Sequence, residues 1–306
     1  MKADAELPLP GVTLSAKKMP GHWLLARLGK RVLRPGGLDL TRSMLQSLAI
    51  RRSDAVVEFV PGLGVTTQLV VDLQPASYIG IEENAAAAER IGSTLTNFRH
   101  KCLIASAADT GLPADSVTVV LGEAMLTMQG EARKGQIVRE AARILKPGGR
   151  YGIHELCLVP DDLDVSIKLE IQQVLSQAIH VGARPLTARE WRGLLDGAGF
   201  NLRAEVFRPM RLLQPRRLIR DEGWPGALRF AWNLCRDFEV RERVFAMRRV
   251  FRKYHSHLAA IMLTGIKRRE RRLHHEQFGP DLSGNGSPPF SPEDRLETSW
   301  RKARFI

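Results

Sequence analysis

Short apolar segments alternate with helix-compatible segments through the middle of the chain, and this alternation restricts the fold more than any other feature. Five of the apolar segments have the length and composition of buried strands: 55–60, 78–81, 101–105, 116–121 and 150–156. Between the last two, residues 136–145 place their apolar side chains on one helical face, and the sequence KPGG at 146–149 ends that helix. Alternation of this kind is typical of a parallel sheet that helices cover on both faces.

The pattern continues beyond the fifth strand. A helix over 187–198 begins with a capping box, in which Thr187 is the cap and Glu190 lies three residues later. Two more strands are expected at 201–213 and 259–266. We therefore predict an α/β protein with a doubly wound, mostly parallel sheet of seven strands, to which basic helices are added.

Basic charge is concentrated on both sides of this α/β segment. The net charge is +13; residues 1–53 carry 10 Lys and Arg against 3 Asp and Glu, and residues 203–272 carry 19 against 7. Residues 54–202, by contrast, carry 13 against 18. Flanks of this charge favour an anionic partner, such as a membrane surface, a small anion or RNA, beside a core with a different function.

These patterns divide the chain into three parts. Residues 1–48 are expected to form a basic helical lid, in which 19–33 are a short amphipathic helix that packs over the core or lies on an anionic membrane. Residues 49–267 form the α/β domain, with a basic helical insertion at about 215–256. Residues 268–306 contain a stretch rich in Gly, Ser and Pro and are expected to be disordered.

Composition excludes several classes of protein. No apolar run is long enough to span a bilayer and no secretory segment opens the chain, so a cytoplasmic protein is expected. The three cysteines, Cys102, Cys157 and Cys235, are far apart and lack metal-type spacing. A disulfide framework and a structural metal site are therefore not expected.

A glycine turn, Pro61-Gly62-Leu63-Gly64, follows the first predicted strand. Such a turn lets a ligand approach the backbone closely at the start of the next helix. The segment lacks the lysine of a phosphate-binding Walker loop, and it lacks the third glycine of a dinucleotide fingerprint. The turn therefore matches neither of these two nucleotide-binding motifs.

Three carboxylates accompany the turn. Glu58 precedes it in the first strand, Glu82 ends the second strand, and Asp109 follows the third. Because carboxylates accept hydrogen bonds, they suit a ligand with an amino group, a ribose and an adenine but no phosphate. Glu83 is the alternative to Glu82 for the ribose, and a plain cap or turn role is the alternative for Glu58 and Asp109.

Taken together, the motifs resemble those of a known family. VVEFVPGLG, YIGIEEN, AADTGLPADSVTVVLGEAM and AARILKPGGRYGIHEL are similar, in order and spacing, to successive motifs of the class I S-adenosylmethionine-dependent methyltransferases. The group that they resemble most is the type-11 small-molecule methyltransferases, which include quinone-biosynthesis C-methyltransferases. The resemblance covers residues 50–200 and implies a Rossmann-like methyltransferase fold with S-adenosylmethionine as cofactor.

The resemblance also implies which residues bind the cofactor: Glu58, Gly62, Gly64, Glu82, Asp109 and Gly122. In the family pattern, Glu58 orients the turn and the methionine amine, and the two glycines of the turn pass under the methionine part. Glu82 holds the ribose hydroxyls, and Asp109 binds the adenine amine. This sequence departs from the pattern at Val60, which replaces the family's first glycine.

Catalytic residues are expected near the ends of the fourth and fifth strands, where the ligands of such sheets lie. Glu123, next to Gly122, would face the methyl-bearing sulfur, with a helix-cap role as the alternative. His154 and Glu155 are candidates for a general base, which methyl transfer needs only if the acceptor loses a proton. Strand alternation gives the alternative that one of this pair lies in the core. His180 is a further candidate, in a segment that commonly forms a lid.

Three functions are compatible with these features. The favoured one is an S-adenosylmethionine-dependent methyltransferase that acts on a small acceptor, either lipophilic or anionic. The alternatives are an RNA methyltransferase, for which the basic flanks provide the charge, and a non-catalytic binding protein, for which Val60 argues. Peripheral contact with an anionic membrane fits the same flanks. Nucleic acid is the less favoured partner because the sequence shows no recognised RNA-binding module.

Overall fold

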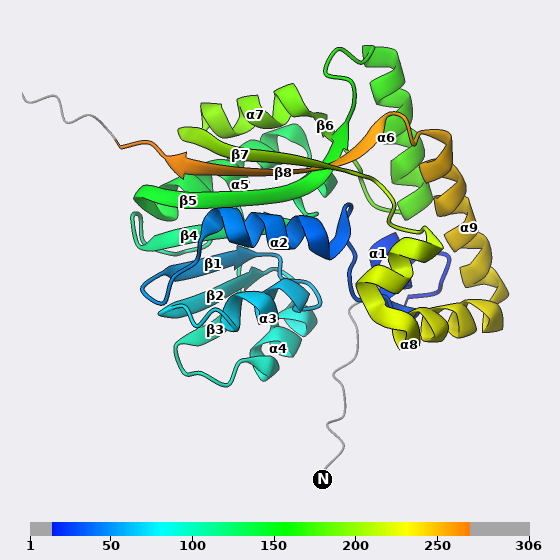
Figure 1. Ribbon diagram of the computed structural model, residues 1–306, viewed down its shortest axis with the longest axis horizontal. Helices are drawn as coiled ribbons and strands as arrows, with labels where there is room; N and C mark the ends of the chain where they lie inside the picture. The colour runs from blue at the N-terminus through cyan, green and yellow to red at the C-terminus, as the bar shows by residue number, and fades with distance from the viewer. Residues whose placement is uncertain (1–13, 270–306) are drawn as a thin grey trace, which may run out of the picture. The chain divides into compact units, whose positions relative to one another are not determined.

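The computed structural model describes residues 14–269, in which strands and helices alternate as predicted (Figure 1). The elements are, in order: α1 (Gly21–Arg27), α2 (Gly37–Leu48), β1 (Ala55–Phe59), α3 (Val65–Val71), β2 (Ser77–Glu82), α4 (Ala85–Thr94), β3 (His100–Ile104), β4 (Val117–Glu123), the 3₁₀ turn η1 (Leu126–Met128), α5 (Glu131–Ile144), β5 (Leu145–Leu158), α6 (Val165–Ile179), β6 (Leu186–Thr187), α7 (Ala188–Gly197), β7 (Phe200–Pro209), α8 (Pro215–Arg236), α9 (Phe238–Lys253) and β8 (Leu258–Lys267). The tail predicted at 268–306 lies, apart from its first two residues, outside the described residues.

The strands form one sheet of mixed direction. Its order is β3-β2-β1-β4-β5-β8-β7, and the two-residue strand β6 pairs with β5 beside this path. Strands β3, β2, β1, β4 and β5 are parallel, whereas β8 is antiparallel to both of its neighbours. The prediction of a doubly wound, mostly parallel sheet is confirmed, and the short β6 is added to the seven predicted strands.

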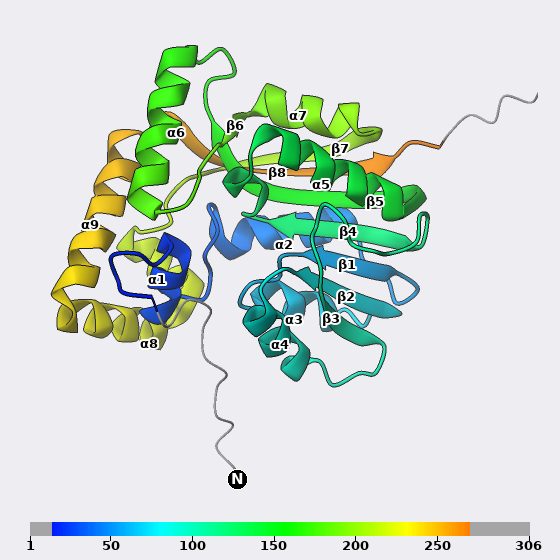
Figure 2. The same ribbon diagram turned by 180° about the vertical axis from the view of Figure 1, so that it is seen from behind.

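Helices cover both faces of the sheet (Figures 1 and 2). On one face, the apolar residues of α2 and α3 that pack on the strands include Leu40, Met44, Leu48 and Val70. On the other face, α5 and α7 contribute Ile137, Val138, Ala141, Ile144, Trp191 and Leu195. The capping box predicted at the start of α7 is confirmed, since Thr187 and Glu190 exchange hydrogen bonds there. Burial of apolar surface on both sides is the main favourable term in the stability of such a sheet.

The N-terminal segment places its two helices differently from the prediction. Helix α2 belongs to the sheet, because Leu40, Met44 and Leu48 recur every four residues and are fully buried against the strands. Residues 1–48 were predicted to form the lid, but α2 packs on the sheet, so only described residues before α2 cover the strand ends. Helix α1 is shorter than the helix predicted over 19–33, because the turn after it holds Gly29 at φ +97°, where glycine is favoured.

Four helices, α1, α6, α8 and α9, form what we call the helical cap (Figure 1). One of its apolar clusters joins α1, α8 and α9 and includes Leu24, Leu25, Phe230, Val244 and Met247. Another joins α6 to β5 and includes Leu156, Leu158, Ile171 and Leu175. The basic helical segment predicted at about 215–256 forms α8 and α9. Among residues 14–269, every helix is too short or too polar to traverse a bilayer.

A buried ion-pair network joins the N-terminal segment to α8. The Lys30 ammonium, which is fully buried, lies 3.5 Å from the Glu222 carboxylate and 3.8 Å from that of Asp221. Glu222 also accepts hydrogen bonds from the backbone N–H groups of Arg31 and Val32, at 3.0 and 2.9 Å. Because an unpaired charge is costly to bury, these contacts fix how α8 lies against the N-terminal segment.

Candidate active site

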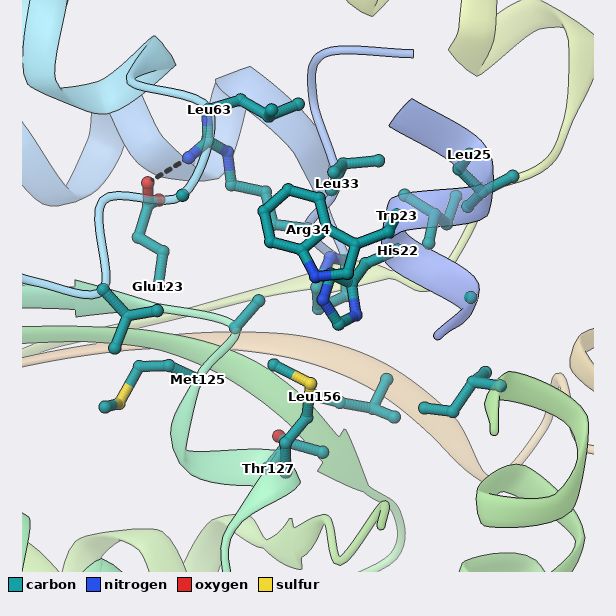
Figure 3. A pocket seen from close by; sticks show the side chains of 18 of the residues that line it. His22, Trp23, Leu25, Leu33, Arg34, Leu63, Glu123, Met125, Thr127 and Leu156 are labelled. Carbon is teal, nitrogen blue, oxygen red and sulfur yellow. Dashed lines mark hydrogen bonds and ion pairs between the residues drawn. The ribbon is translucent and has the colours of Figure 1, made fainter. Parts of the chain in front are cut away.

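A cavity of about 420 Å³ lies between the strand ends and the helical cap (Figure 3). Four parallel strands reach it near their carboxyl ends, through Val60 after β1, Glu82 of β2, Glu123 of β4 and Leu156 of β5. Helices α1, α6 and α9 line the opposite side. Ligands of open α/β sheets bind outside the carboxyl ends of the strands, so this cavity is the candidate active site.

The cavity has a polar side and an apolar side. Charged and amide side chains from the strand ends and the N-terminal segment line the polar side: Arg31, Arg34, Glu58, Glu82, Glu83, Asn84 and Glu123. The cap, β5 and the segment after β7 supply the apolar side: Trp23, Leu25, Leu156, Leu175, Ile179, Met210, Leu212, Met247 and Phe251. A pair of ligands, one polar and one apolar, fits such a division.

The turn after β1 has a left-handed backbone at three positions. The angle φ is +53° at Val60, +59° at Gly62 and +76° at Gly64. At Gly64 a side chain would also clash, since an added Cβ would lie 2.8 Å from Cδ1 of Ile91. Glycine adopts such angles readily, whereas a residue such as Val60 does so at a cost of about 1–3 kcal/mol. Val60 replaces a glycine but keeps the conformation of glycine, so the turn retains the shape that the motif specifies.

Glu58 is buried beside this turn. Its Oε2 accepts hydrogen bonds from the Tyr78 hydroxyl at 2.6 Å and from the Thr67 hydroxyl at 2.9 Å. Burial raises the pKa of Glu58 to about 7, against the opposing effect of these two donors. Both bonds end on Oε2, which leaves Oε1 for a ligand in the cavity that Glu58 lines.

Glu82 and its neighbour Glu83 have different surroundings. Glu82 is buried at the end of β2, lines the cavity, and accepts a hydrogen bond from the backbone N–H of Asn84 at 3.0 Å. Burial raises the pKa of Glu82. Glu83 has a largely exposed side chain, and its carboxylate pairs with the Arg133 guanidinium at 2.9 Å. This difference favours Glu82 over Glu83 as the carboxylate that meets a ligand.

Glu123 accepts hydrogen bonds from four side chains, those of Arg34, Thr41, Thr66 and His154. Arg34 Nη1 lies 2.5 Å from Oε2, while the Thr41 hydroxyl and His154 Nδ1 lie 2.6 and 2.7 Å from Oε1. Burial would raise the pKa of Glu123, but the Arg34 guanidinium and the hydrogen bonds hold it at about 2. A carboxylate this weakly basic, with both oxygens engaged, positions other groups rather than removes a proton from an acceptor.

His154 and Glu155, the predicted general bases, are fully buried and do not line the cavity. The His154 ring bridges two groups, the Glu123 carboxylate through Nδ1 and the Pro35 carbonyl oxygen through Nε2. The Glu155 carboxylate accepts three backbone N–H groups of the turn after β4, at 2.8–3.0 Å. Each side chain thus holds a loop next to the cavity in place, and neither one faces the ligand space.

Four other predicted residues lie outside the cavity lining: Gly64, Asp109, Gly122 and His180. Asp109 is exposed in the turn after β3, where its backbone N–H bonds to the carbonyl three residues before it. His180 ends α6 in a left-handed conformation, with φ +55°. From the predicted set, the cavity brings together Glu58, Gly62, Glu82 and Glu123. Between residues 14 and 269, no group of three or more His, Cys, Asp or Glu side chains is arranged to hold a metal.

Comparisons with known proteins agree with this geometry. The model of the type-11 methyltransferase domain matches residues 57–153. An uncharacterized protein of Haemophilus influenzae is 32% identical over 241 residues, which cover 77% of this chain and 93% of that protein. This chain belongs to the class I methyltransferases of type 11.

Solved structures share the fold of the methyltransferase. The MccD protein aligns with a TM-score of 0.62 over 77% of this chain and 99% of its own, at 17% identity. Phosphoethanolamine N-methyltransferase 2 of Haemonchus contortus, solved with S-adenosylmethionine, aligns with a TM-score of 0.60 over 81% of this chain and 57% of its own, at 14% identity. The match to the methyltransferase domain confirms the predicted enzyme class and the predicted cofactor, S-adenosylmethionine, and favours an enzyme over the non-catalytic alternative.

Arg34 and His22 line the cavity of the methyltransferase but are not among the predicted site residues. Arg34 reaches Glu123 from the segment between α1 and α2, and its Nε and Nη2 are buried without a hydrogen-bond partner among the described residues. His22 of α1 lines the cavity beside Trp23, with the two ring centroids 4.8 Å apart (Figure 3). Burial lowers the pKa of His22 to about 4, so the ring is neutral at pH 7. The amphipathic pattern over 19–33 was the only signal in the sequence for this part of the cavity.

The left-handed backbone at Val60 predicts an unusual ranking of substitutions. At such a position glycine is favoured over alanine, whereas in a helix alanine is favoured. We expect the free energy of unfolding of Val60→Gly to exceed that of Val60→Ala by about 1 kcal/mol, measured by urea denaturation. Ala142→Gly in α5 is the control, and it should lose about 1 kcal/mol. If Val60→Gly is less stable than Val60→Ala, the turn is not strained.

The raised pKa of Glu58 predicts a pH dependence of stability. The pKa is about 7 in the folded state and 4.5 for an ordinary glutamate, so the folded state holds more protons between these values. The free energy of unfolding contributed by Glu58 therefore falls as the pH rises through this window. The Glu58→Gln side chain does not titrate, so its free energy of unfolding does not fall in this way. Relative to the wild type, the free energy of unfolding of Glu58→Gln should therefore rise by about 3 kcal/mol from pH 4.5 to pH 7. Urea denaturation of the ligand-free proteins measures it, and a difference that stays constant with pH contradicts a buried, protonated Glu58.

Proposed function

We propose that the protein transfers a methyl group from S-adenosylmethionine to a small, lipophilic acceptor in the apolar side of the cavity. The observation that supports this most strongly is the division of a single cavity into polar strand ends and an apolar cap. Methyl transfer requires the two ligands to meet in a fixed orientation, in a space from which water is excluded. A cavity with one side suited to each ligand meets that requirement.

The polar side fits the cofactor, which supplies, when bound, a sulfonium methyl group open to in-line displacement. Glu82 would hold the ribose hydroxyls, and Glu58 would accept from the amino group through its free Oε1. The unpartnered Nε and Nη2 of Arg34 suit the carboxylate of the methionine part, since a guanidinium binds a carboxylate with two parallel hydrogen bonds. At Gly62, the nearest atom to an added Cβ is the Val60 carbonyl oxygen at 3.9 Å, so the backbone there is open to a ligand.

The remaining predicted cofactor and catalytic residues would act less directly. Glu123 would keep Arg34 in place through their buried ion pair, and Gly122 would let the end of β4 lie close to the cavity. Asp109 would bind the adenine amine from its exposed turn, and we expect a smaller contribution from it because it lies outside the cavity lining. His154 would support Glu123 from behind.

The apolar side fits the body of a lipophilic acceptor, and His22 is the polar group within it. Its neutral ring can accept a hydrogen bond from a hydroxyl or amine and so orient that oxygen or nitrogen toward the methyl group. Because His154 and Glu155 have their polar atoms engaged elsewhere, we assign the contact with the acceptor to His22 in their place. A group with a pKa of about 4 acts here by orientation more than by removal of a proton.

Titration calorimetry with S-adenosylmethionine tests the cofactor site. Glu82→Ala should bind the cofactor about 10- to 100-fold more weakly, because hydrogen bonds to a charged group are lost. Asp109→Ala should bind it about fivefold more weakly, as expected for one ordinary hydrogen bond. Glu83→Ala is the matched control and should bind like the wild type, since its carboxylate pairs with Arg133 at the surface. If the Glu82→Ala and Glu83→Ala proteins bind S-adenosylmethionine with equal affinity, the proposed cofactor site is wrong.

Transfer of an isotope-labelled methyl group identifies the class of acceptor. The wild-type protein is incubated with methyl-labelled S-adenosylmethionine and, separately, with the organic extract, the aqueous small molecules and the RNA of a cell lysate. We expect the label in the organic extract, and we expect His22→Ala to lower its transfer about tenfold, as for the loss of one orienting hydrogen bond. Label in the RNA alone would instead support the alternative of an RNA methyltransferase, and label in the aqueous fraction an anionic or other polar acceptor.

A further inference from the structure

The outer face of α8 and α9 exposes large apolar side chains. Trp224, Leu228 and Trp232 follow at intervals of four residues in α8, so they share one side of the helix, and each is 64–67% exposed. Phe245 of α9 is 46% exposed and lines the same hollow as Trp224 and Leu228. We call these four side chains the aromatic face. Single exposed apolar residues are common on protein surfaces, but a contiguous set marks a site of interaction.

Basic side chains accompany the aromatic face. Helices α8 and α9 together contain 11 Arg and Lys but only 4 Asp and Glu. Both acids of α8 are turned inward, because they pair with the buried Lys30. Arg249 and Arg252 line a hollow with Phe245, and within residues 14–269 no carboxylate forms an ion pair with either of them. The surface therefore combines apolar side chains with unneutralised positive charge.

The aromatic face is continuous with the active-site cavity. Its hollow shares Leu212 and Arg248 with a second hollow. That second hollow shares Met210, Leu212 and Phe251 with the cavity itself. Hollows lined by both apolar and basic side chains thus connect the outside of the cap with the space that the proposed function assigns to the acceptor.

We propose that the aromatic face docks on the surface of an anionic lipid membrane. Tryptophan and leucine would lie at the boundary of headgroups and acyl chains, and Arg249 and Arg252 would contact lipid phosphates. Aliphatic side chains such as Leu212 and Leu218 line the connecting hollows together with arginines, and this combination suits acyl chains with their anionic headgroups. Delivery of a lipophilic acceptor along this route rests on the proposed function, but the docking itself does not.

Sedimentation of the full chain with lipid vesicles tests the proposal. Vesicles of equimolar phosphatidylglycerol and phosphatidylcholine should bind the protein, and vesicles of phosphatidylcholine alone should bind it at least about tenfold more weakly. Arg249→Gln combined with Arg252→Gln should weaken binding to the anionic vesicles about 30-fold. Trp224→Ala combined with Trp232→Ala should weaken it about tenfold or more. The matched control is Phe98→Ala with Arg99→Gln, an exposed aromatic ring with an arginine over it outside α8 and α9, which should bind like the wild type.

Several outcomes would overturn the proposal. The proposal is wrong if the wild type fails to bind anionic vesicles or binds neutral and anionic vesicles equally. It is also wrong if both double variants bind anionic vesicles as the wild type does. Retention on immobilised polyuridylate at physiological salt without vesicle binding also overturns it, and assigns the surface to RNA. Circular dichroism and thermal unfolding show that each variant is folded, and calorimetry with S-adenosylmethionine measures cofactor binding. The calorimetry separates the two proposals, since a protein that binds vesicles but not the cofactor contradicts the proposed function and leaves the docking intact.

Discussion

The buried contact between Arg34 and Glu123 is the interaction on which the arrangement of the cavity depends. Arg34 comes from the N-terminal segment and Glu123 from the end of β4, and Thr41 of α2 and Thr66 of α3 bond to the same carboxylate. One charged group thus connects the N-terminal segment, two helices and the sheet. Neither charge is tolerable in the interior without the other, so the polar side of the cavity exists only when the N-terminal segment is in place.

The same contact explains why two of the predicted catalytic residues, His154 and Glu155, do not line the cavity. His154 supports Glu123 from the neighbouring strand, and Glu155 holds the turn that follows Glu123. Polar residues at strand ends are the expected catalytic residues in this fold, but here His154 and Glu155 hold other parts of the site in position. The groups left free to meet ligands are Glu58, Glu82, His22 and the unpartnered nitrogens of Arg34.

Much of the fold could be predicted from the sequence, because the features that specify it depend on residues close together in the chain. The strand–helix alternation, the turn at Gly62 and Gly64 and the capping box at Thr187 all depend on neighbouring residues, and the structure has each of them. The Arg34–Glu123 pair joins residues 89 positions apart, and no pattern of neighbouring residues predicts a contact over that distance in the sequence. The apolar repeat of α2, at Leu40, Met44 and Leu48, is local as well, but a repeat alone does not show whether a helix packs on the sheet or on a lid.

The nine residues from 28 to 36, between α1 and α2, carry both of the buried cations described above. Lys30 is held by the acids of α8, and Arg34 by the end of β4. These two pairs hold residues 30–34 against α8 and the sheet, whereas α1 itself is held by its apolar contacts with α8 and α9. Moving residues 30–34 away from the cavity would break one of these pairs, at a cost of about 3–5 kcal/mol, so this segment is a fixed wall of the site.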